Sequence, residues 1–359
     1  MNKNIIIHPE ALTALKNYKL PPCPLPFGQV IAPIMLICDH QNGAWGKMEI
    51  FPYGPIPLAP TAKVFHYAQE IFEGMKAYKH SDGHSWLFRA EKNMARFNLS
   101  SERMAIPTVP EEMFMEAVET VSALCLEHTP SESGHSLYLR PFSMATEENL
   151  GVKPSNSYKF IVIASPSGAY FNKDSVPVFV EQVYTRACHG GIGNAKTGGN
   201  YAASLKAANV AKKAGHLMTL WLDAYEKRYI EELSGMNFFC VIKGELVTPK
   251  LNDTILDGIT RDSLIELAKR EAYKVREERL DIHELFKLIE SGDCTEAFAC
   301  GTAAIISPIE CLGIESGHNY KFKYPIGPVA QKLRALLLDI QEGRREGPKG
   351  WMKKVERRF

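Results

Sequence analysis

The sequence predicts a mixed α/β (α+β) chain built from two modules. Strand-like apolar runs alternate with helix-like periodic runs along the whole chain, and a turn-rich segment divides them near the middle. The length of 359 residues agrees with two or so domains. Apolar residues make up 45% of the chain and charged residues 23%, which is ordinary for a globular protein and excludes general disorder.

The first module is expected to start with extended, proline-rich chain. Prolines crowd residues 21–26 and 52–60, and they exclude helix interiors there. The turn Gln41-Asn42-Gly43 is expected to join two strands. Residue pattern and spacing predict strands at 34–38, 45–50, 136–140 and 158–164, and helices at 91–104 and 111–127.

The boundary between the modules is expected at 165–175, where SPSGAYFNKDS is rich in turn residues. We predict a smaller N-terminal α/β domain over 1–170, an interdomain loop over 171–180 and a larger C-terminal domain over 181–359. In the second half, strands are expected at 176–185, 217–222, 238–242 and 296–300, and helices at 201–214, 261–272 and 329–340. Gly215 is a natural stop for the first of these helices.

The charge balance excludes a protein whose main task is to grip a polyanion. Lys and Arg number 42 against 41 Asp and Glu, so the formal net charge is +1. The final run 343–359 carries seven cations, but two acids are mixed in and no amphipathic stripe is visible. We therefore expect a solvated terminus pinned by Trp351, with no nucleic-acid or membrane partner.

The sequence favours a cytoplasmic location. The start, MNKNIIIHPEALTALK, is a poor signal peptide, and the longest apolar run, 30–38, is far too short to span a bilayer. Eight cysteines are spread over the chain with no C-x-x-C spacing. We expect buried, reduced thiols and no metal site.

Five glycines surround Lys196 between residues 190 and 199, and glycine lets backbone approach a ligand closely. One interpretation is a phosphate-binding P-loop, since 190–197 resembles G-x-x-x-x-G-K-T and the strand ending at Asp223 could hold magnesium. Against it, Ala195 stands where a P-loop needs glycine, and Gly198 and Gly199 delay the helix. The second interpretation is a desolvated amine that condenses with a carbonyl, as pyridoxal phosphate requires. An exposed surface lysine is the third.

Several blocks of sequence decide among these interpretations. They are HYAQEIFEGMKAY (66–78), FRAEKNMARF (88–97), LYLRP (137–141), SPSGAYF (165–171), GGIGNAKTGGNYAASL (190–205), EELSGMNFF (231–239), TPKLNDTILDGITRDS (248–263) and GTAA (301–304). Each block is weak alone, but in this order and spacing they resemble the branched-chain aminotransferases. The resemblance runs from about Phe27 to the C-terminus.

The resemblance implies a two-domain fold type IV pyridoxal-phosphate-dependent aminotransferase. Its expected reaction is transamination between branched-chain L-amino acids (leucine, isoleucine, valine) and 2-oxoglutarate, giving branched-chain 2-oxo acids and L-glutamate. The expected cofactor is pyridoxal 5′-phosphate, the partners are these small molecules, and the expected assembly is a homodimer.

Carried over residue by residue, the resemblance makes Lys196 the Schiff-base lysine and the base that moves the substrate proton. Tyr201 matches the tyrosine at the cofactor's phenolic oxygen. Glu232 matches the acid at the pyridine nitrogen, and it is preferred to Glu231 because the family's acid lies five residues before an asparagine, here Asn237.

The phosphate is expected to bind a guanidinium and backbone N–H groups. Arg96 matches the family's phosphate-binding arginine, whose fork suits two phosphate oxygens. Ile259 and Thr260 stand where a helix is expected to begin, so their N–H groups would face an anion. Thr302 resembles a further phosphate ligand, and its turn, with Ala303, is expected to hold the substrate α-carboxylate.

The side-chain pocket is expected to be aromatic, which suits an aliphatic substrate. The aromatic positions that match the family are Phe27, Tyr67, Phe72, Tyr138 and Tyr170. Arg140 matches the residue that, with Tyr138, accepts the distal carboxylate of 2-oxoglutarate.

One departure from some animal members concerns a redox-sensitive C-x-x-C pair, replaced here by Ala304 and Ser307, so we expect no such thiol switch. Other activities of the same fold, D-amino-acid transamination or aminodeoxychorismate lyase chemistry, are the first alternative. A P-loop nucleotide-binding protein is the second, and a non-catalytic relative the third.

Overall fold

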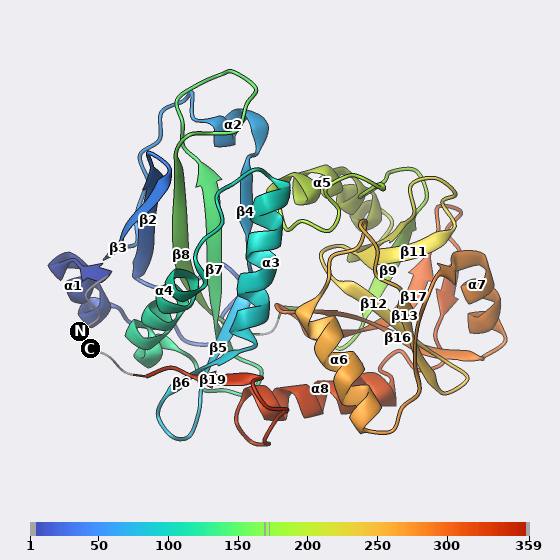
Figure 1. Ribbon diagram of the computed structural model, residues 1–359. Helices are drawn as coiled ribbons and strands as arrows, with labels where there is room; N and C mark the ends of the chain where they lie inside the picture. Colours follow the sequence, from blue (N-terminus) through green and yellow to red (C-terminus); the bar gives the residue numbers. More distant parts are fainter. Residues whose placement is uncertain (1–4, 169, 172, 357–359) are drawn as a thin grey trace. The chain divides into compact units, whose positions relative to one another are not determined.

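A computed structural model describes residues 5–168, 170–171 and 173–356 of the chain. The chain forms two compact units (Figure 1). The first comprises the described residues of Met1–Tyr170, Ala195–Gly198 and Asp339–Phe359, and the second those of Phe171–Asn194 and Gly199–Leu338. The first unit thus takes in two segments from the second half, one of which carries Lys196, whereas the predicted ranges were consecutive. How far each range folds on its own stays a prediction.

Some sequence-based expectations fall on residues that the structure does not describe. Residues 169 and 172 of the expected boundary segment 165–175 lie outside the described part, as do residues 357–359 of the basic C-terminal run and residues 1–4. No helix within the described ranges is long and apolar enough to cross a bilayer.

Eight α-helices are found in the described residues. They are α1 (Pro9–Asn17), α2 (Lys63–Tyr67), α3 (Ala90–Arg103), α4 (Glu111–Leu124), α5 (Gly198–Lys213), α6 (Ile259–Arg270), α7 (Ile282–Glu290) and α8 (Pro328–Gln341). A short 3₁₀ turn, Leu126–His128, follows α4, so the helix expected at 111–127 is confirmed but tightens at its end. The helices expected at 91–104, 261–272 and 329–340 correspond to α3, α6 and α8.

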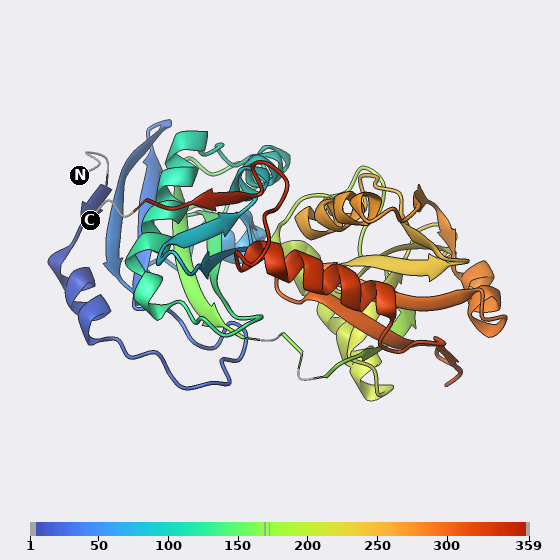
Figure 2. The same ribbon diagram turned by 90° about the horizontal axis from the view of Figure 1, so that it is seen from below.

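Strands of the first unit form one sheet in the order β1-β3-β2-β8-β7-β5-β6-β19, with β4 added beside β7. Their bounds are β1 (Ile5–Ile7), β2 (Ile34–Gln41), β3 (Ala44–Pro52), β4 (Glu70–Phe72), β5 (Met75–Lys79), β6 (Ser85–Phe88), β7 (Ser136–Ala145), β8 (Tyr158–Ser167) and β19 (Met352–Lys354). The predicted β2–β3 hairpin is confirmed, because Asn42 and Gly43 adopt φ angles of 51° and 80° as a two-residue hairpin turn requires. The last strand, β19, pairs with β6 (Figure 2).

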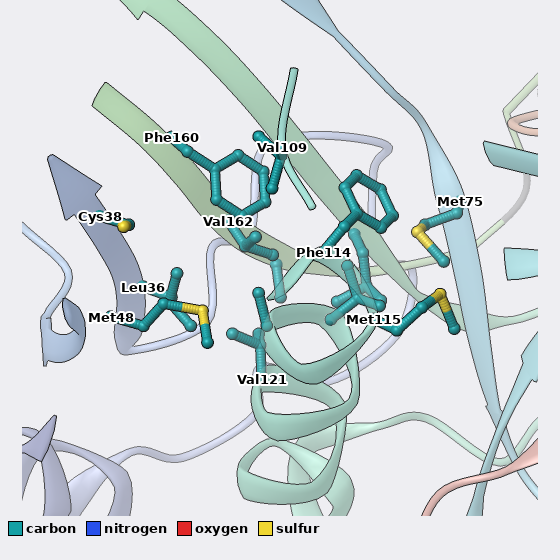
Figure 3. Packing of buried hydrophobic residues seen from close by; sticks show 14 of the residues in the cluster. Leu36, Cys38, Met48, Met75, Val109, Phe114, Met115, Val121, Phe160 and Val162 are labelled. Atoms are coloured by element: carbon teal, nitrogen blue, oxygen red, sulfur yellow. The ribbon is translucent and has the colours of Figure 1, made fainter. Parts of the chain in front are cut away.

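The core of this unit lies between the sheet and α4. Figure 3 shows Phe114, Met115 and Val121 of the α4 region facing Leu36 and Phe160 from the strands. Apolar residues recur on α4 at helical spacing, whereas every second residue of β2 and β8 faces the helix. β7 pairs with β8 and β4 pairs with β7, so both strands are hydrogen-bonded to this packed part of the sheet.

Strands of the second unit form another sheet in the order β14-β13-β12-β16-β17-β9-β10-β11-β15, with β18 beside β17. Their bounds are β9 (Val176–Glu181), β10 (Met218–Leu222), β11 (Tyr229–Leu233), β12 (Asn237–Ile242), β13 (Glu245–Pro249), β14 (Val275–Glu278), β15 (Leu280–Asp281), β16 (Cys294–Gly301), β17 (Ile305–Gly313) and β18 (Asn319–Lys321). The strand expected at 176–185 ends early, because the Glu181 carboxylate accepts the N–H groups of Val183 and Tyr184 and turns the chain.

The Ala-rich helix starts earlier than expected. It begins at Gly198 and not at Tyr201, and its end is as predicted, with Gly215 at a φ of 83°. All eight cysteines are free, and six are buried while Cys23 and Cys188 are exposed. The expectation of buried thiols therefore holds for six of them, and their reduced state stays a prediction.

Candidate active site

Backbone hydrogen bonds fix the lysine segment to the first unit. The N–H of Lys196 donates to the Ser100 hydroxyl at 2.9 Å, and its carbonyl accepts the N–H of Phe72 at 3.0 Å. The segment is thereby tied to α3 on one side and to β4 on the other. Its side chain consequently leaves a backbone that cannot easily shift.

Glu70 of β4 secures the two residues that follow the lysine. Its backbone carbonyl accepts the Thr197 hydroxyl at 2.8 Å, and its carboxylate accepts the N–H of Gly198. A Cβ at Gly198 would collide with that carboxylate, so glycine permits this close approach of the Glu70 side chain. Burial raises the pKa of the Glu70 carboxyl, although its hydrogen bonds to Gly198 and Thr197 oppose the shift.

The ring of Phe72 lies against two cations. The Lys196 Nζ is 4.8 Å from the ring centroid, and the guanidinium carbon of Arg140 is 4.6 Å from it. Arg140 also donates from Nη2 to the hydroxyl of Tyr138 at 2.9 Å. Aromatic faces attract cations, so Phe72 holds an amine and a guanidinium close together.

Two more aromatic rings extend this group. Phe27 packs edge-on against Tyr138 at 4.8 Å and against Tyr170 at 5.1 Å between centroids. The predicted pocket residues Phe27, Phe72, Tyr138, Arg140 and Tyr170 are therefore linked by direct contacts. Tyr67 is different, because its hydroxyl donates to the carbonyl of Leu150 and no described contact joins it to the group.

Arg96 is paired with a carboxylate that the sequence analysis did not single out. Its Nε and Nη2 donate to the two oxygens of Glu73 at 2.6 and 2.9 Å. Asn93 donates to the same carboxylate at 2.7 Å. Burial would raise the pKa of Glu73, but the charge and hydrogen bonds of Arg96, with help from Lys196 and Asn93, hold it below its ordinary value.

In the second unit, β11 directs two neighbouring glutamates to different partners. Glu232 accepts the N–H of Leu256 at 2.9 Å and pairs with Arg186 at 3.0 Å. Glu231 accepts the hydroxyl of Thr254 at 2.5 Å, and burial raises the pKa of its carboxyl. Glu232 is thus the one of the two that forms a described ion pair, and its choice over Glu231 stays a prediction.

Arg186 is a functional candidate that the sequence analysis missed. Its side chain is 7% exposed, and its Nη2 also donates to the carbonyls of Gly193 and Thr254. It thereby joins the glycine-rich loop to the Glu232 carboxylate. An arginine in a loop gives no sequence pattern that separates this buried position from an exposed one.

The helix α6 begins two residues before Arg261, where the sequence analysis expected its start, and no side chain caps it. Ile259 and Thr260 are its first two residues, and the residue before them, Gly258, has no side chain that could cap the N-terminal N–H groups. A Cβ at Gly258 would collide with the Asn237 side chain. Asn237 in turn donates to the Leu256 carbonyl at 3.0 Å and fixes this loop.

The remaining predicted residues also lie in the second unit. Thr302 and Ala303 form the turn between β16 and β17, which is closed by pairing of Gly301 with Ile305. Tyr201 lies in the first turns of α5, and a Cβ on Gly235 would stand 3.3 Å from its ring. Both positions are half-buried.

Taken chemically, the residues supply a distinct set of groups. The first unit supplies the Lys196 amine at an aromatic face and the guanidinium groups of Arg96 and Arg140. The second unit supplies the Glu232 carboxylate, which is paired with Arg186, and the uncapped start of α6. An aldehyde, a basic ring nitrogen and a phosphate are the groups that such a set binds. The donors present therefore fit pyridoxal phosphate.

This geometry does not fit a P-loop. The lysine of a P-loop opens its helix, whereas Lys196 precedes α5 and is bonded to β4 and α3. Asp223, the supposed magnesium ligand, accepts the N–H groups of Tyr225, Glu226, Arg228 and Tyr229 in a tight turn.

Comparison with known proteins gives concordant results. Residues 70–311 match the family described as amino-transferase class IV. The chain is 45% identical over 347 residues to branched-chain-amino-acid transaminase 1 of Bacillus subtilis, covering 96% of this chain and 98% of that protein. It is 44% identical over 337 residues to the branched-chain-amino-acid aminotransferase of Mycolicibacterium smegmatis, covering 92% of each.

Solved structures give the same picture. The branched-chain amino acid aminotransferase of Escherichia coli superposes with a TM-score of 0.74 at 28% identity, over 89% of this chain and 99% of that one. A second branched-chain amino acid aminotransferase was solved in complex with N-(5′-phosphopyridoxyl)-L-glutamate. It superposes with a TM-score of 0.73 at 28% identity, over 91% of this chain and 100% of that one.

Proposed function

This chain belongs to the class IV aminotransferases, and from that membership we propose that it is a branched-chain aminotransferase. It transfers the amino group between leucine, isoleucine or valine and 2-oxoglutarate, with pyridoxal 5′-phosphate as cofactor. The observation that carries this proposal is the contact of Phe72 with both Lys196 and Arg140. Such a site offers an apolar wall to an aliphatic side chain and a cation to a dicarboxylate.

The cofactor supplies an aldehyde that takes up amino groups and a ring that accepts electron density from the substrate carbon. Lys196 would hold the aldehyde, and its amine would serve as the base for the proton at the substrate α-carbon. The fixed backbone around Lys196 supports this role, because a proton carrier must stay within reach of its target.

Glu232 is proposed to face the ring nitrogen and keep it protonated, with Arg186 orienting the carboxylate. Tyr201 is proposed to hydrogen-bond the phenolic oxygen. The phosphate is assigned to Arg96, to the N–H groups of Ile259 and Thr260, and to Thr302. The turn of Thr302 and Ala303 is assigned to the substrate α-carboxylate.

The substrate side chain is assigned to the aromatic group of the first unit. Phe27, Phe72, Tyr138 and Tyr170 are joined to one another or to Arg140 by contacts. Tyr67 is added to the proposed pocket by its match to the family alone. The distal carboxylate of 2-oxoglutarate is assigned to Arg140 and the Tyr138 hydroxyl, which already share a hydrogen bond. Arg140→Ala is therefore expected to impair the use of 2-oxoglutarate more than that of leucine.

The test combines a substrate assay with mapping of the cofactor lysine. Leucine and 2-oxoglutarate should give glutamate, D-alanine should not react, and borohydride reduction followed by peptide mapping should label Lys196. Lys196→Ala should abolish transamination, whereas Lys206→Ala, an exposed lysine on α5, should retain it. Residual activity of more than a few per cent in Lys196→Ala contradicts the assignment.

We also propose that the chain forms a homodimer. Phe65, Leu150 and Val152 are exposed by 61%, 58% and 87% and come from α2 and the loop it contacts through Tyr67 and Leu150. Exposed apolar groups of this kind are typical of interaction surfaces. Light scattering should give the mass of a dimer, and Val152→Asp should shift it toward the monomer while Leu12→Asp, an exposed leucine on α1, should not.

A cytoplasmic location is the last part of the proposal. Eight free cysteines support it, since thiols persist in a reducing compartment. Cell fractionation should recover the protein with cytoplasmic markers, and recovery with secreted or membrane fractions contradicts it.

A further inference from the structure

Glu73 is a fully buried carboxylate with four donors around it. Arg96 contributes Nε and Nη2, at 2.6 and 2.9 Å, and Asn93 contributes its amide at 2.7 Å. The N–H of Gly74 donates to the same side chain at 3.1 Å. Both oxygens are therefore fixed, and the charge is matched by a guanidinium that is itself 10% exposed.

The position of this pair is as informative as its geometry. Glu73 follows Phe72, whose ring contacts Lys196 and whose N–H is bonded to the Lys196 carbonyl. Arg96 lies on α3, one turn before Ser100, which accepts the Lys196 N–H. The ion pair therefore joins the two elements that hold the lysine segment.

We propose that Glu73 is a positioning residue that orients the guanidinium of Arg96 for the phosphate of the cofactor. This inference rests on the proposed function, because it assumes that Arg96 receives that phosphate. A guanidinium carries five N–H donors in a rigid plane, so a carboxylate that takes two of them sets the direction of the rest. Without it the long side chain of Arg96 rotates among several conformers and presents its fork less often.

A purely structural ion pair is the alternative. Breaking a buried pair destabilises a protein wherever the pair lies. The test therefore needs a measurement that stability alone does not move. Comparison of pyridoxal phosphate with pyridoxal supplies it, because pyridoxal has the same aldehyde and ring but no phosphate.

The experiment measures the dissociation constants of both compounds for the apoprotein of Glu73→Gln. We expect the preference for pyridoxal phosphate over pyridoxal to fall about tenfold, since a charge-assisted contact is weakened. Glu147→Gln is the matched control. It removes a carboxylate from the fully buried Lys63 of the same unit and should lower stability while leaving the preference unchanged.

Arg96→Gln and the double variant Glu73→Gln/Arg96→Gln complete a cycle. If Glu73 acts through Arg96, the double variant has the same preference as Arg96→Gln alone. The double variant is also charge-balanced, so the comparison remains available if Glu73→Gln alone does not fold.

An unchanged preference in Glu73→Gln, or a further loss in the double variant beyond that of Arg96→Gln, overturns the proposal. A wild-type protein that binds no pyridoxal phosphate refutes the proposed function instead. The two failures are thereby distinct.

Discussion

Gly74 shows how a single missing side chain shapes the candidate site. A Cβ at this position would collide with the Tyr138 hydroxyl, which accepts a hydrogen bond from Arg140. We predict that Gly74→Ala displaces this hydroxyl and raises the KM for 2-oxoglutarate by about tenfold, with a smaller effect on leucine. Steady-state kinetics with each substrate measures this.

Gly54→Ala is the control for that prediction. Gly54 is half-buried, its backbone lies outside the left-handed region, and nothing stands within 4 Å of its Cβ position. Equal changes in both glycine variants, or equal effects on both substrates, would count against the role of the Tyr138–Arg140 pair.

The pKa values of Glu73 and Glu70 are shifted in opposite directions, so the two carboxyl groups should respond oppositely when the free energy of unfolding is measured at falling pH. Burial would raise the pKa of Glu73, but the nearby Arg96 outweighs burial and lowers this pKa. The Glu73 carboxylate therefore stabilises the fold above the unfolded-state pKa of about 4.3, and this stabilisation is lost as pH falls through its lower folded-state pKa. Burial raises the pKa of Glu70, so its contribution is present below about 4.3 and is lost as pH rises through its folded pKa.

Urea denaturation at a series of acidic pH values tests this pair. The stability difference between wild type and Glu73→Gln should shrink as the solution is acidified. The stability difference between wild type and Glu70→Gln should grow. If the stability difference changed in the same direction with pH for both variants, the Arg96 contact would not be what lowers the pKa of Glu73.

At the same scale, the sequence predicted part of the candidate site. Phe72, Tyr138, Arg140 and Lys196 were each assigned a role by the family resemblance, and the structure links them by contacts. Arg186 was not predicted, because a charged residue buried by tertiary contacts has the same local sequence as an exposed one. Glu73 was missed for the same reason, although it stands beside residues that were recognised.

Asp281 illustrates stability at the scale of an element. It caps α7, where its Oδ1 accepts the N–H of His283 at 2.8 Å and of Glu284 at 3.4 Å. Asp281→Ala should cost about 1 kcal/mol in the free energy of unfolding. Asp281→Asn should cost less, because the amide oxygen still accepts. Chemical denaturation checks both, and an equal loss in the two variants would assign the effect to the Arg228 ion pair instead.

Elements with long, regular patterns were predictable, and short or irregular ones were not. The β2–β3 hairpin, α3 and α4 follow directly from spacing and turn residues. β4 has only three residues, and one of them is a glutamate, a residue type that is usually exposed. Its sequence therefore shows no alternation of polar and apolar residues long enough to predict a strand. The start of α5 was placed too late because its first residues, Gly198 to Asn200, are poor helix formers. Here Glu70 accepts the Gly198 N–H, a tertiary bond that propensity does not contain.

For the molecule as a whole, the proposed cofactor should act as a stabilising ligand. A compound that binds only the folded state adds about 2.7 kcal/mol at a hundredfold excess over its Kd. We predict that pyridoxal phosphate raises the Tm of the apoprotein by roughly 3 °C or more. Pyridoxal phosphate should raise the Tm of Lys196→Ala by less, and it should raise the Tm of Lys206→Ala by as much as that of wild type.

Inorganic phosphate at the same concentration is the control for that measurement. An equal rise with phosphate alone would mean that the anion site, and not the lysine, accounts for the stabilisation.

The pairing of β19 with β6 has a consequence for biosynthesis of the polypeptide. Met352–Lys354 covers the edge of the first sheet, the Trp351 carbonyl accepts the N–H of Arg89 at 2.7 Å, and Val355 donates to Ser85 at 2.9 Å. A ribosome makes β6 long before β19, because all strands of the second sheet lie between them in the sequence. The edge of β6 therefore stays unpaired while those strands are made, and an unpaired strand edge is a site of aggregation in a nascent chain.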